Sequence, residues 1–419
     1  MDAGNTAWML ISTGLVLFMT PGLAFFYGGM VRARNVLGML MQNFFAMGLL
    51  AVIWVVLAFS LAFGNFGNGG LIGNLDFVGL RDVGQGLGPS AMGLTIPVVL
   101  FCAYQMTFAV ITPALLTGAT ADRLKFGAYA TFIGIWLVVV YAPVAHWVFG
   151  GGWLARLGAL DFAGGAVVHI NAGAAALALI LVLGRRIGWP KEGMHPHSLP
   201  LTMLGTGILW FGWFGFNAGS ALAADGVAAT AVMNTFLAAS AGMLGWLAIE
   251  RVKDGRATTL GAASGAVAGL VAITPCAGFV SGLSPLAIGA VTGVLCFLAI
   301  QLKYRFGYDD SLDVIGVHLV GGLVGSLLLG LFADSAVNRL VTHEGLFFGG
   351  GLTLLGYQAV ASVSVLTFSL VVSLALAKVI DLSMGLRVSE DDEVLGLDLS
   401  QHAETAYAFG DLATMDRIS

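Results

Sequence analysis

The stretches Ala166-Val-Val-His-Ile-Asn-Ala-Gly173 and Ile315-Gly-Val-His-Leu-Val-Gly-Gly322 each place one histidine in a long apolar run. Keeping an ionisable side chain inside hydrocarbon is costly, so a membrane segment that carries one is a functional-site hypothesis by default. A lone buried histidine is more often a packing residue. Two histidines in matching surroundings, His169 and His318, favour a function, and the rest of the chain indicates which one.

Composition predicts an all-α polytopic membrane protein. The chain has 419 residues, of which 58% are hydrophobic and only 10% charged, whereas a soluble domain carries roughly a quarter charged residues. Apolar runs of about twenty residues recur along the chain, and each can cross roughly 30 Å of hydrocarbon. Eleven transmembrane helices are predicted, at about 8–30, 40–63, 93–118, 127–149, 164–184, 200–219, 228–249, 259–276, 284–302, 312–333 and 351–380.

Charge and cysteine content exclude several other classes of function. The net charge is −5 and no basic block is present, so we expect no nucleic-acid partner. The cysteines Cys102, Cys276 and Cys296 are scattered singly in apolar segments, which predicts neither a disulfide framework nor a metal site. No phosphate-binding loop or nucleophile triad is visible. We therefore expect no cofactor, no metal and no enzymatic activity.

The basic residues predict the orientation in the membrane. All of them except Arg81, Arg156 and Arg339 fall on one side of the predicted spans, the set on that side including Arg417 near the C-terminus. The positive-inside rule then places the N-terminus outside and the C-terminus in the cytoplasm. Residues 1–381 form the predicted membrane domain. Residues 64–92 read as an external loop, and residues 382–419 as a cytoplasmic tail, more often a solvated appendage than a regulator.

The spacing of two aspartates relates the two histidine segments. Asp161 and Asp310 each precede a histidine by eight residues, and eight helical residues rise about 12 Å. Because the fifth and tenth spans run in opposite directions, His169 and His318 should meet near the middle of the bilayer. This reversal predicts an inverted repeat of spans one to five and six to ten, followed by a long eleventh helix, with a functional site between the halves.

Aromatic residues accompany the two segments. They lie in Tyr104-Gln-Met-Thr-Phe108, Phe149-Gly-Gly-Gly152 and Trp213-Phe-Gly-Phe-Asn-Ala-Gly-Ser220. Aromatic faces attract cations by roughly 0.5–2 kcal/mol. Aromatics at span ends are usually interfacial belt residues, so each one alone is weak evidence for a cation site.

Several motifs together resemble the ammonium transporter family (Amt/MEP/Rh), in its bacterial Amt form, over essentially the whole chain. They are Asp161-Phe-Ala-Gly-Gly165, Val168-His-Ile-Asn-Ala172, Gly212-Trp-Phe-Gly-Phe-Asn-Ala-Gly-Ser220, Gly269-Leu-Val-Ala-Ile-Thr-Pro275, Gly316-Val-His318 and Gly385-Leu-Arg-Val388.

The resemblance implies a role for each of the residues singled out. His169 and His318 would be twin pore histidines that share a hydrogen bond. Phe108 and Phe216 would form a gate of stacked rings, and Phe108, Phe149 and Ser220 an ammonium recruitment site. Asp161 would have an electrostatic and structural role at the vestibule. Further residues that would line the pore are Tyr104, Trp213, Asn217 and Thr274.

Two positions depart from the family pattern. Phe149 stands where many bacterial relatives have tryptophan, and Tyr104 where they have phenylalanine. Phenylalanine offers a weaker cation–π face than tryptophan, so the family resemblance does not determine the affinity and selectivity of the recruitment site.

The predicted function is transport of ammonium or ammonia, with methylammonium as a further substrate, across the bacterial inner membrane. The resemblance also implies a homotrimer and a PII-type nitrogen-regulatory partner at the cytoplasmic face. Transport is electrogenic if the proton crosses separately and electroneutral if it stays outside. A sensor that signals through the tail with little flux is the alternative from another class.

Overall fold

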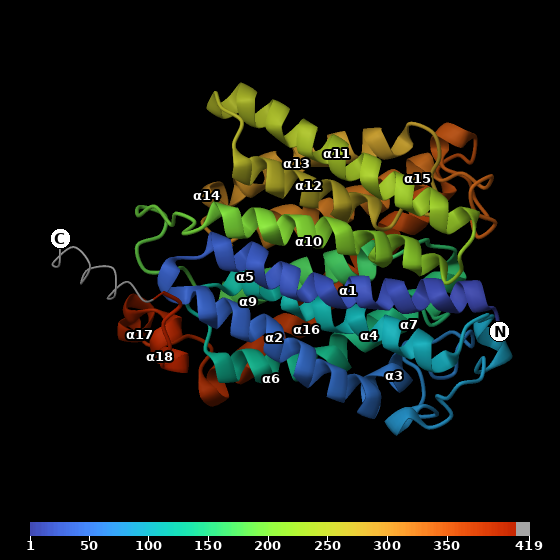
Figure 1. The fold of residues 1–419 in the computed structure, drawn as a ribbon, viewed down its shortest axis with the longest axis horizontal. Coiled ribbons are helices and arrows are strands. Elements are labelled where there is room, and N and C mark those ends of the chain that lie inside the picture. Colours follow the sequence, from blue (N-terminus) through green and yellow to red (C-terminus); the bar gives the residue numbers. More distant parts are fainter. Residues whose placement is uncertain (408–419) are drawn as a thin grey trace, which may run out of the picture.

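The computed structural model describes residues 1–407, and its regular structure is helical (Figure 1). Two isolated bridge pairs, Leu124 with Arg387 and Val280 with Ala333, are the only extended pairings within that range. The α-helices are α1 Ala3–Met30, α2 Val36–Ile53, α3 Phe59–Phe63, α4 Val98–Ala114, α5 Leu116–Thr120, α6 Phe126–Trp136, α7 Ala142–Val148, α8 Trp153–Leu157, α9 Asn171–Leu183, α10 Leu199–Ala218, α11 Gly226–Asp254, α12 Thr259–Ile273, α13 Ser284–Ile300, α14 Leu302–Phe306, α15 Val320–Phe332, α16 Thr353–Met384, α17 Glu390–Leu395 and α18 Leu397–His402.

Short helical segments of other types join several of these helices. The π-helical ones are η2 Trp54–Ala58, η5 Leu137–Tyr141, η6 Gly165–Ile170 and η8 Ile315–Leu319. The 3₁₀ turns are η1 Ala33–Asn35, η3 Val78–Leu80, η4 Ser90–Met92, η7 Gly219–Ala221 and η9 Leu346–Phe348.

Ten helical segments of the described chain are long and apolar enough to cross a membrane, and α12 is a shorter apolar helix. The prediction of an all-helical, multi-span membrane protein is confirmed. The count of eleven spans stays a prediction, because α12 falls short of a full span by length. The ten segments are Ala3–Met30, Ala33–Phe63, Val98–Thr120, Phe126–Leu157, Gly165–Leu183, Leu199–Ala221, Gly226–Asp254, Ser284–Phe306, Ile315–Phe332 and Thr353–Met384.

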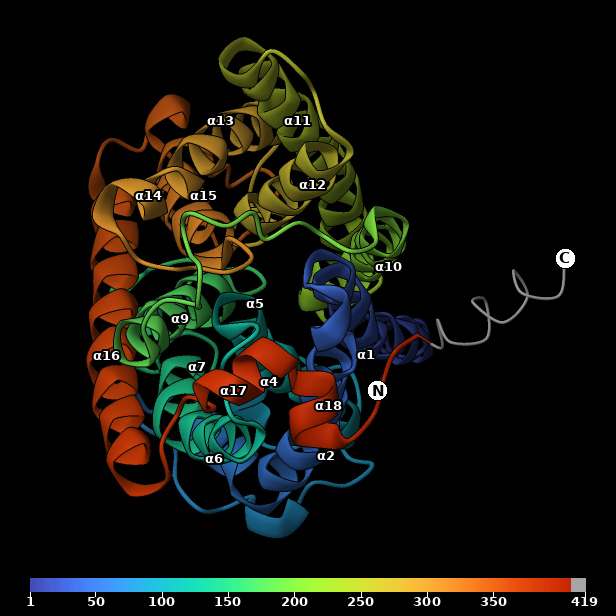
Figure 2. The ribbon, with the colours of Figure 1, turned by 90° about the vertical axis from the view of Figure 1, so that its left-hand side faces the viewer.

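The long helices run side by side in two groups (Figures 1 and 2). One group holds α1 to α9 and the other α10 to α15, while α16 lies along the side of both. The first helices of the two groups pack against each other in opposite directions. At one end the backbone N–H of Ser198 donates to the carbonyl of Gly29, and at the other the N–H of Ala224 donates to the side chain of Asn5.

Small residues allow the close approach of α1 and α10. A Cβ atom added to Gly205 would lie 2.2 Å from the backbone nitrogen of Phe26, and one added to Gly22 would lie 2.6 Å from a methyl group of Ile208. Helices in a membrane gain van der Waals contact and interhelical hydrogen bonding from such approach, because lipid supplies no hydrophobic drive between them. This explains part of the high glycine content.

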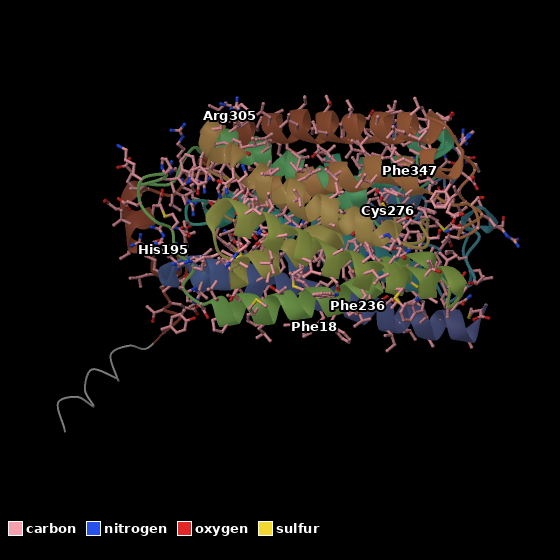
Figure 3. The ribbon with its side chains drawn as sticks, turned by 90° about the horizontal axis from the view of Figure 1, so that it is seen from above. Phe18, His195, Phe236, Cys276, Arg305 and Phe347 are labelled. Carbon is pink, nitrogen blue, oxygen red and sulfur yellow. The ribbon has the colours of Figure 1, made fainter. Side chains whose placement is uncertain are left out.

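The outer surface is apolar around the middle of the bundle and polar at its ends. Phe18 and Phe236 project from the flank with about half of their surface exposed, 49% and 52% (Figure 3). His195 and Arg305 lie at the end opposite the N-terminus. Such a band of exposed apolar side chains suits contact with lipid tails.

The described part of the predicted tail is packed on the bundle. Helices α17 and α18 cover the end of the molecule opposite the N-terminus (Figures 1 and 2). Leu386, Val388 and Leu397 are buried, so this part differs from the solvated appendage expected. Its hydrogen bonds to α2 and to the loop before α6 hold it there. Helix α16 itself continues to Met384, beyond the predicted boundary at 381. Residues 408–419, with Arg417, lie outside the described residues.

Candidate functional site

The two histidines of the opening stretches meet inside the bundle. The Nδ1 atoms of His169, on η6, and His318, on η8, lie 3.2 Å apart, and the ring planes differ by 24°. Both side chains are buried. One Nδ1 must donate and the other accept, so this contact fixes opposite tautomers in the two neutral rings. The structure thus brings together the residues that the reversed helix directions placed at one depth.

A narrow apolar cavity adjoins the histidine pair. It offers only about 10 Å³ for the centre of a water-sized molecule. The Nε2 atom of His169 is buried and has no hydrogen-bond partner among the described residues. The cavity therefore presents an imidazole nitrogen to a small polar guest, with little to stabilise a charge. Its other lining residues are Met19, Leu23, Phe26, Ile111, Leu115, Val168, Leu209, Trp213, Phe216 and Val267.

Two aspartates orient the helices that carry the histidines. The Asp161 carboxylate accepts hydrogen bonds from the backbone N–H groups of residues 164 to 167, at 2.6–3.2 Å. The Asp310 carboxylate accepts from Val314 and Ile315, at 3.1 and 2.7 Å. Each carboxylate satisfies N–H groups at a helix start, where no helical acceptor exists. Their position favours anchoring the histidine helices over contact with a substrate.

Burial affects both carboxylates. It raises the pKa of Asp161, while the four backbone N–H groups oppose the rise. It also raises the pKa of Asp310 to about 7, assisted by the charge of Asp313 and opposed by Lys303 and the backbone N–H groups. Desolvation disfavours the charged form of a carboxyl, which accounts for both directions.

A pair of tilted phenylalanine rings lies between the histidine cavity and a larger one. The ring centroids of Phe108 and Phe216 are 4.3 Å apart, at an interplanar angle of 35°, and both rings are buried. Phe108 lines the larger cavity and Phe216 lines the histidine cavity. The ring pair therefore lies between the two cavities.

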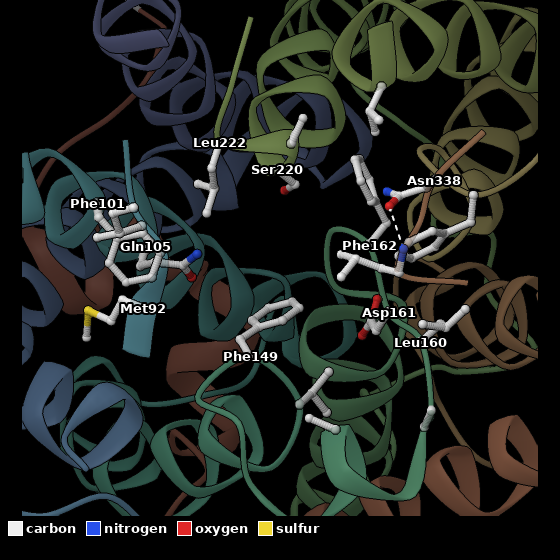
Figure 4. A pocket seen from close by; sticks show the side chains of 18 of the residues that line it. Met92, Phe101, Gln105, Phe149, Leu160, Asp161, Phe162, Ser220, Leu222 and Asn338 are labelled. Atoms are coloured by element: carbon white, nitrogen blue, oxygen red, sulfur yellow. Dashed lines mark hydrogen bonds between the residues drawn. The ribbon is translucent and has the colours of Figure 1, made fainter. Parts of the chain in front are cut away.

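The larger cavity contains all the residues of the expected recruitment site. It has a volume of about 500 Å³, and Phe108, Phe149 and Ser220 line it. Figure 4 shows Phe149 and Ser220 on different sides of the same open space, with Gln105 and Asp161 also at its wall. Gln105 was not among the predicted site residues, although an amide in an apolar span is a signal that the sequence offers.

The four remaining predicted lining residues divide into two kinds. Trp213 lines the histidine cavity, and its ring stacks on His169 at a centroid distance of 5.6 Å. The polar groups of the others are bonded to protein, except Oδ1 of Asn217, which has no hydrogen-bond partner among the described residues. The Thr274 hydroxyl accepts the Trp213 indole N–H at 2.9 Å, and the Asn217 amide donates to Thr235 at 2.9 Å. Tyr104 lies behind Phe108 and is fully buried. These three support the wall and do not face the described cavities.

A third cavity lies toward the opposite end of the molecule. It has a volume of about 430 Å³, and Met30 and Asp313 are among its lining residues. Met30 follows Phe26 by about one turn of α1, so this cavity continues the line from the histidine cavity. Lys303 pairs with Asp313 at 2.5 Å at its edge. Sequence reasoning did not identify it, because its walls come from loops that only the fold assembles.

The three cavities therefore follow one another along the bundle. The first is wide and ends at the two phenylalanine rings, the second is narrow and apolar and adjoins the two imidazoles, and the third is wide again. Within residues 1–407, no group of three His, Cys, Asp or Glu side chains is placed to hold a metal ion.

Comparison with known proteins identifies the family of this chain. The sequence model of the Ammonium Transporter Family matches residues 7–407. The chain belongs to the ammonium transporter family. It is 51% identical to an ammonium transporter of Mycobacterium tuberculosis, over 97% of this chain and 91% of that one. It is 48% identical to an ammonium transporter of Bacillus subtilis, over 97% and 99%.

Solved structures of the ammonium transporter family agree in fold. Candida albicans Mep2 superimposes with a TM-score of 0.88 at 38% identity, covering 97% of this chain and 91% of that one. A structure described as a sensor Amt protein gives a TM-score of 0.87 at 28% identity, covering 95% and 98%. The chain transports ammonium or ammonia, and as a transporter it is not an enzyme.

Proposed function

We propose that the three cavities are one transport path, in which ammonium is recruited at Phe108, Phe149 and Ser220, loses a proton, and crosses as ammonia past His169 and His318. The observation that carries this proposal is the imidazole pair in an apolar cavity closed by the Phe108–Phe216 ring pair. The large cavity in front of the rings holds aromatic faces and a hydroxyl, which suit a cation with N–H donors.

The apolar cavity supports selection by charge. Ammonium and potassium carry the same charge, and both lose their hydration shell only at high cost. An isolated ion in such a cavity costs many kcal/mol, whereas a neutral amine costs little. Ammonium can release a proton and become neutral, and potassium cannot. The unpaired Nε2 of His169 supplies a hydrogen-bond partner for ammonia.

Two routes for the released proton follow from this path. If the proton crosses separately through the imidazole pair, transport is electrogenic, and if it remains on the recruitment side, transport is electroneutral. The direct contact between the two Nδ1 atoms favours the first route, since a hydrogen bond from one ring to the other is a link along which a proton can be passed between the imidazoles.

The membrane setting belongs to the same proposal. The recruitment cavity opens at the N-terminal end, which we place outside a bacterial inner membrane, with the described tail in the cytoplasm. A homotrimer, a PII-type regulatory protein at the tail face and methylammonium as a second substrate are the partners that the family resemblance supports. Native mass spectrometry of the detergent-solubilised protein tests the trimer directly.

A sensor function is the second candidate. The structural likeness to a sensor Amt protein, at 28% identity, is the observation that favours it. A sensor would bind ammonium in the large cavity and pass little flux. Binding without transport would distinguish it.

Reconstituted proteoliposomes test the path. An ammonium pulse should give a current that a potassium pulse does not, and His169→Ala and His318→Ala should each abolish it. His195→Ala, in an exposed loop, is the matched control and should retain the current. Luminal alkalinisation without current in the parent would assign the electroneutral route. If the parent shows neither signal, the transport path is wrong and the sensor is favoured.

A further inference from the structure

Tyr104 reaches the recruitment cavity indirectly, through its hydroxyl group. Its ring meets Phe108 edge-on at 5.0 Å, and the side chain is completely buried. The phenol oxygen lies 2.9 Å from the carbonyl oxygens of both Gly215 and Phe216, and 3.2 Å from the Oγ atom of Ser220. Of the three residues that the phenol oxygen contacts, only Ser220 lines the large cavity.

The backbone around Ser220 leaves space for this hydroxyl. A Cβ atom added to Gly219 would lie 2.7 Å from the phenol oxygen of Tyr104. The approach is therefore available because residue 219 is glycine. Helix α10 ends at Ala218, and the carbonyls of its last turn carry partial negative charge; the Gly215 carbonyl also accepts the Gly219 N–H, which leaves it a second lone pair. The Tyr104 hydroxyl meets two of these carbonyls.

The hydrogen-bond donors and acceptors around Ser220 determine the direction in which its hydroxyl proton points. Carbonyl oxygens only accept, so the Tyr104 proton has two carbonyl acceptors at 2.9 Å, Gly215 and Phe216, and a longer contact to the Ser220 oxygen in which either hydroxyl can donate. The Ser220 hydroxyl donates to the Phe216 carbonyl at 2.9 Å. Its alternative acceptor within reach is the Tyr104 oxygen. In either case the serine proton points into the protein, and the oxygen lone pairs remain for the cavity.

From this geometry we infer that Tyr104 is a positioning residue that keeps Ser220 an acceptor, so that the recruitment site prefers cations that bring their own N–H donors. Ammonium and methylammonium are such cations. Removal of the phenol oxygen takes away one of the two acceptors within reach of the Ser220 proton, so the Phe216 carbonyl alone holds the hydroxyl and donation to water in the cavity becomes more frequent. The inference rests on the recruitment site proposed above and names the residue that sets its hydrogen-bonding direction.

A double-mutant cycle tests this role. Tyr104→Phe, Ser220→Ala and the double variant are compared with the parent for the ammonium concentration at half-maximal transport and for the maximal rate. Tyr129→Phe is the matched control, because it removes another buried phenol oxygen, one that has no hydrogen-bond partner in the described chain. The stabilisation of purified protein by methylammonium in thermal unfolding measures binding without flux.

Tyr104→Phe should raise the half-saturating ammonium concentration about 2- to 10-fold, the range of one net hydrogen bond, with an unchanged maximal rate. It should have no further effect in the Ser220→Ala background, and Tyr129→Phe should resemble the parent. A Tyr104→Phe effect that persists in the Ser220→Ala background would overturn the positioning role while leaving the transport path intact. Absence of both transport and methylammonium binding in the parent would overturn the recruitment site and this inference together.

Discussion

At the scale of single residues, His169 and His318 supply each other with the polar partner that hydrocarbon does not offer. Their Nδ1 atoms share one hydrogen bond, and the Trp213 ring covers one face of His169. A buried imidazole without a partner would be strongly unfavourable. The pair therefore remains neutral and ordered in an apolar wall, with the Nε2 atom of His169 still free of protein partners among the described residues.

The aromatic face of Phe149 gives the first prediction at this scale. Phe149→Trp should lower the half-saturating ammonium concentration by about 2- to 5-fold, because an indole face binds a cation more strongly than a phenyl face by a fraction of a kcal/mol. Initial transport rates in proteoliposomes over a range of ammonium concentrations measure this. Phe18→Trp, on the exposed flank, is the control. An unchanged concentration dependence in Phe149→Trp would remove Phe149 from the recruitment site.

At the scale of elements, the two histidine helices are built alike in opposite directions. Each begins with a π-helical segment, η6 or η8, that carries the histidine. Each has an aspartate that accepts the first backbone N–H groups. π-helical turns are frequent at functional sites because they re-aim side chains that a regular helix would direct elsewhere. The eight-residue spacing thus reflects a shared way of starting a helix.

The contact between these two helices depends on a glycine. A Cβ atom added to Gly173 would lie 2.5 Å from Cβ of Leu319 and 2.7 Å from its backbone. Gly173→Ala should therefore push α9 away from η8 and widen the 3.2 Å contact of the imidazoles. We expect a loss of about 1–3 kcal/mol of stability, typical of overpacking, together with reduced ammonium transport.

Gly207→Ala is the matched control for this change. Nothing lies within 4 Å of a Cβ atom at Gly207, so alanine there should leave stability unchanged or raise it slightly through its better helix propensity. Thermal unfolding of both purified variants and transport in proteoliposomes provide the comparison. Equal behaviour of the two variants would show that the α9–η8 contact does not limit the histidine geometry.

At the scale of the whole molecule, ion pairs and the tail join distant segments at the end opposite the N-terminus. Arg186, after α9, pairs with Asp309 at 2.8 Å and with Asp122 at 3.6 Å. Burial alone would raise the pKa of Asp309, but the hydrogen bonds and charge of Arg186, with the charge of Arg123, lower it. Burial also lowers the pKa of Arg123 to about 10, against the opposing charge of Asp309. This cluster ties both halves of the bundle together.

Helix α2 receives its N-terminal cap from the tail. Asn35 precedes α2 but makes no capping bond to it, and its side chain instead accepts the Leu397 N–H at 2.8 Å. The Asp398 carboxylate accepts the Gly38 N–H at 2.8 Å. An acidic side chain at a helix N-terminus satisfies free donors and complements the helix dipole. The tail is thus part of the membrane domain's own stability.

Asp398→Ala should consequently lower the stability of the whole protein by about 1–2 kcal/mol, the range for loss of a cap. Thermal unfolding of the purified protein in detergent measures the effect. Asp391→Ala, at an exposed position of α17, is the control and should change stability by less than about 0.5 kcal/mol. A similar midpoint for the parent and Asp398→Ala would mean that the tail contributes no cap to α2.

Apolar runs of span length predicted a helical membrane protein, and the mirrored Asp–His spacing predicted that His169 and His318 meet. The resemblance to the ammonium transporter family supplied Phe108, Phe149 and Ser220 as a proposed recruitment site. These signals are strong because hydrocarbon admits few backbone conformations and few polar side chains. The supporting contacts were not predictable in the same way. The Tyr104 hydroxyl at Ser220, the indole bond to Thr274 and the cap of α2 by Asp398 join residues far apart in the chain. In an apolar sequence nearly every position suits burial, so only the packed tertiary structure decides which side chains line the path and which hold its wall.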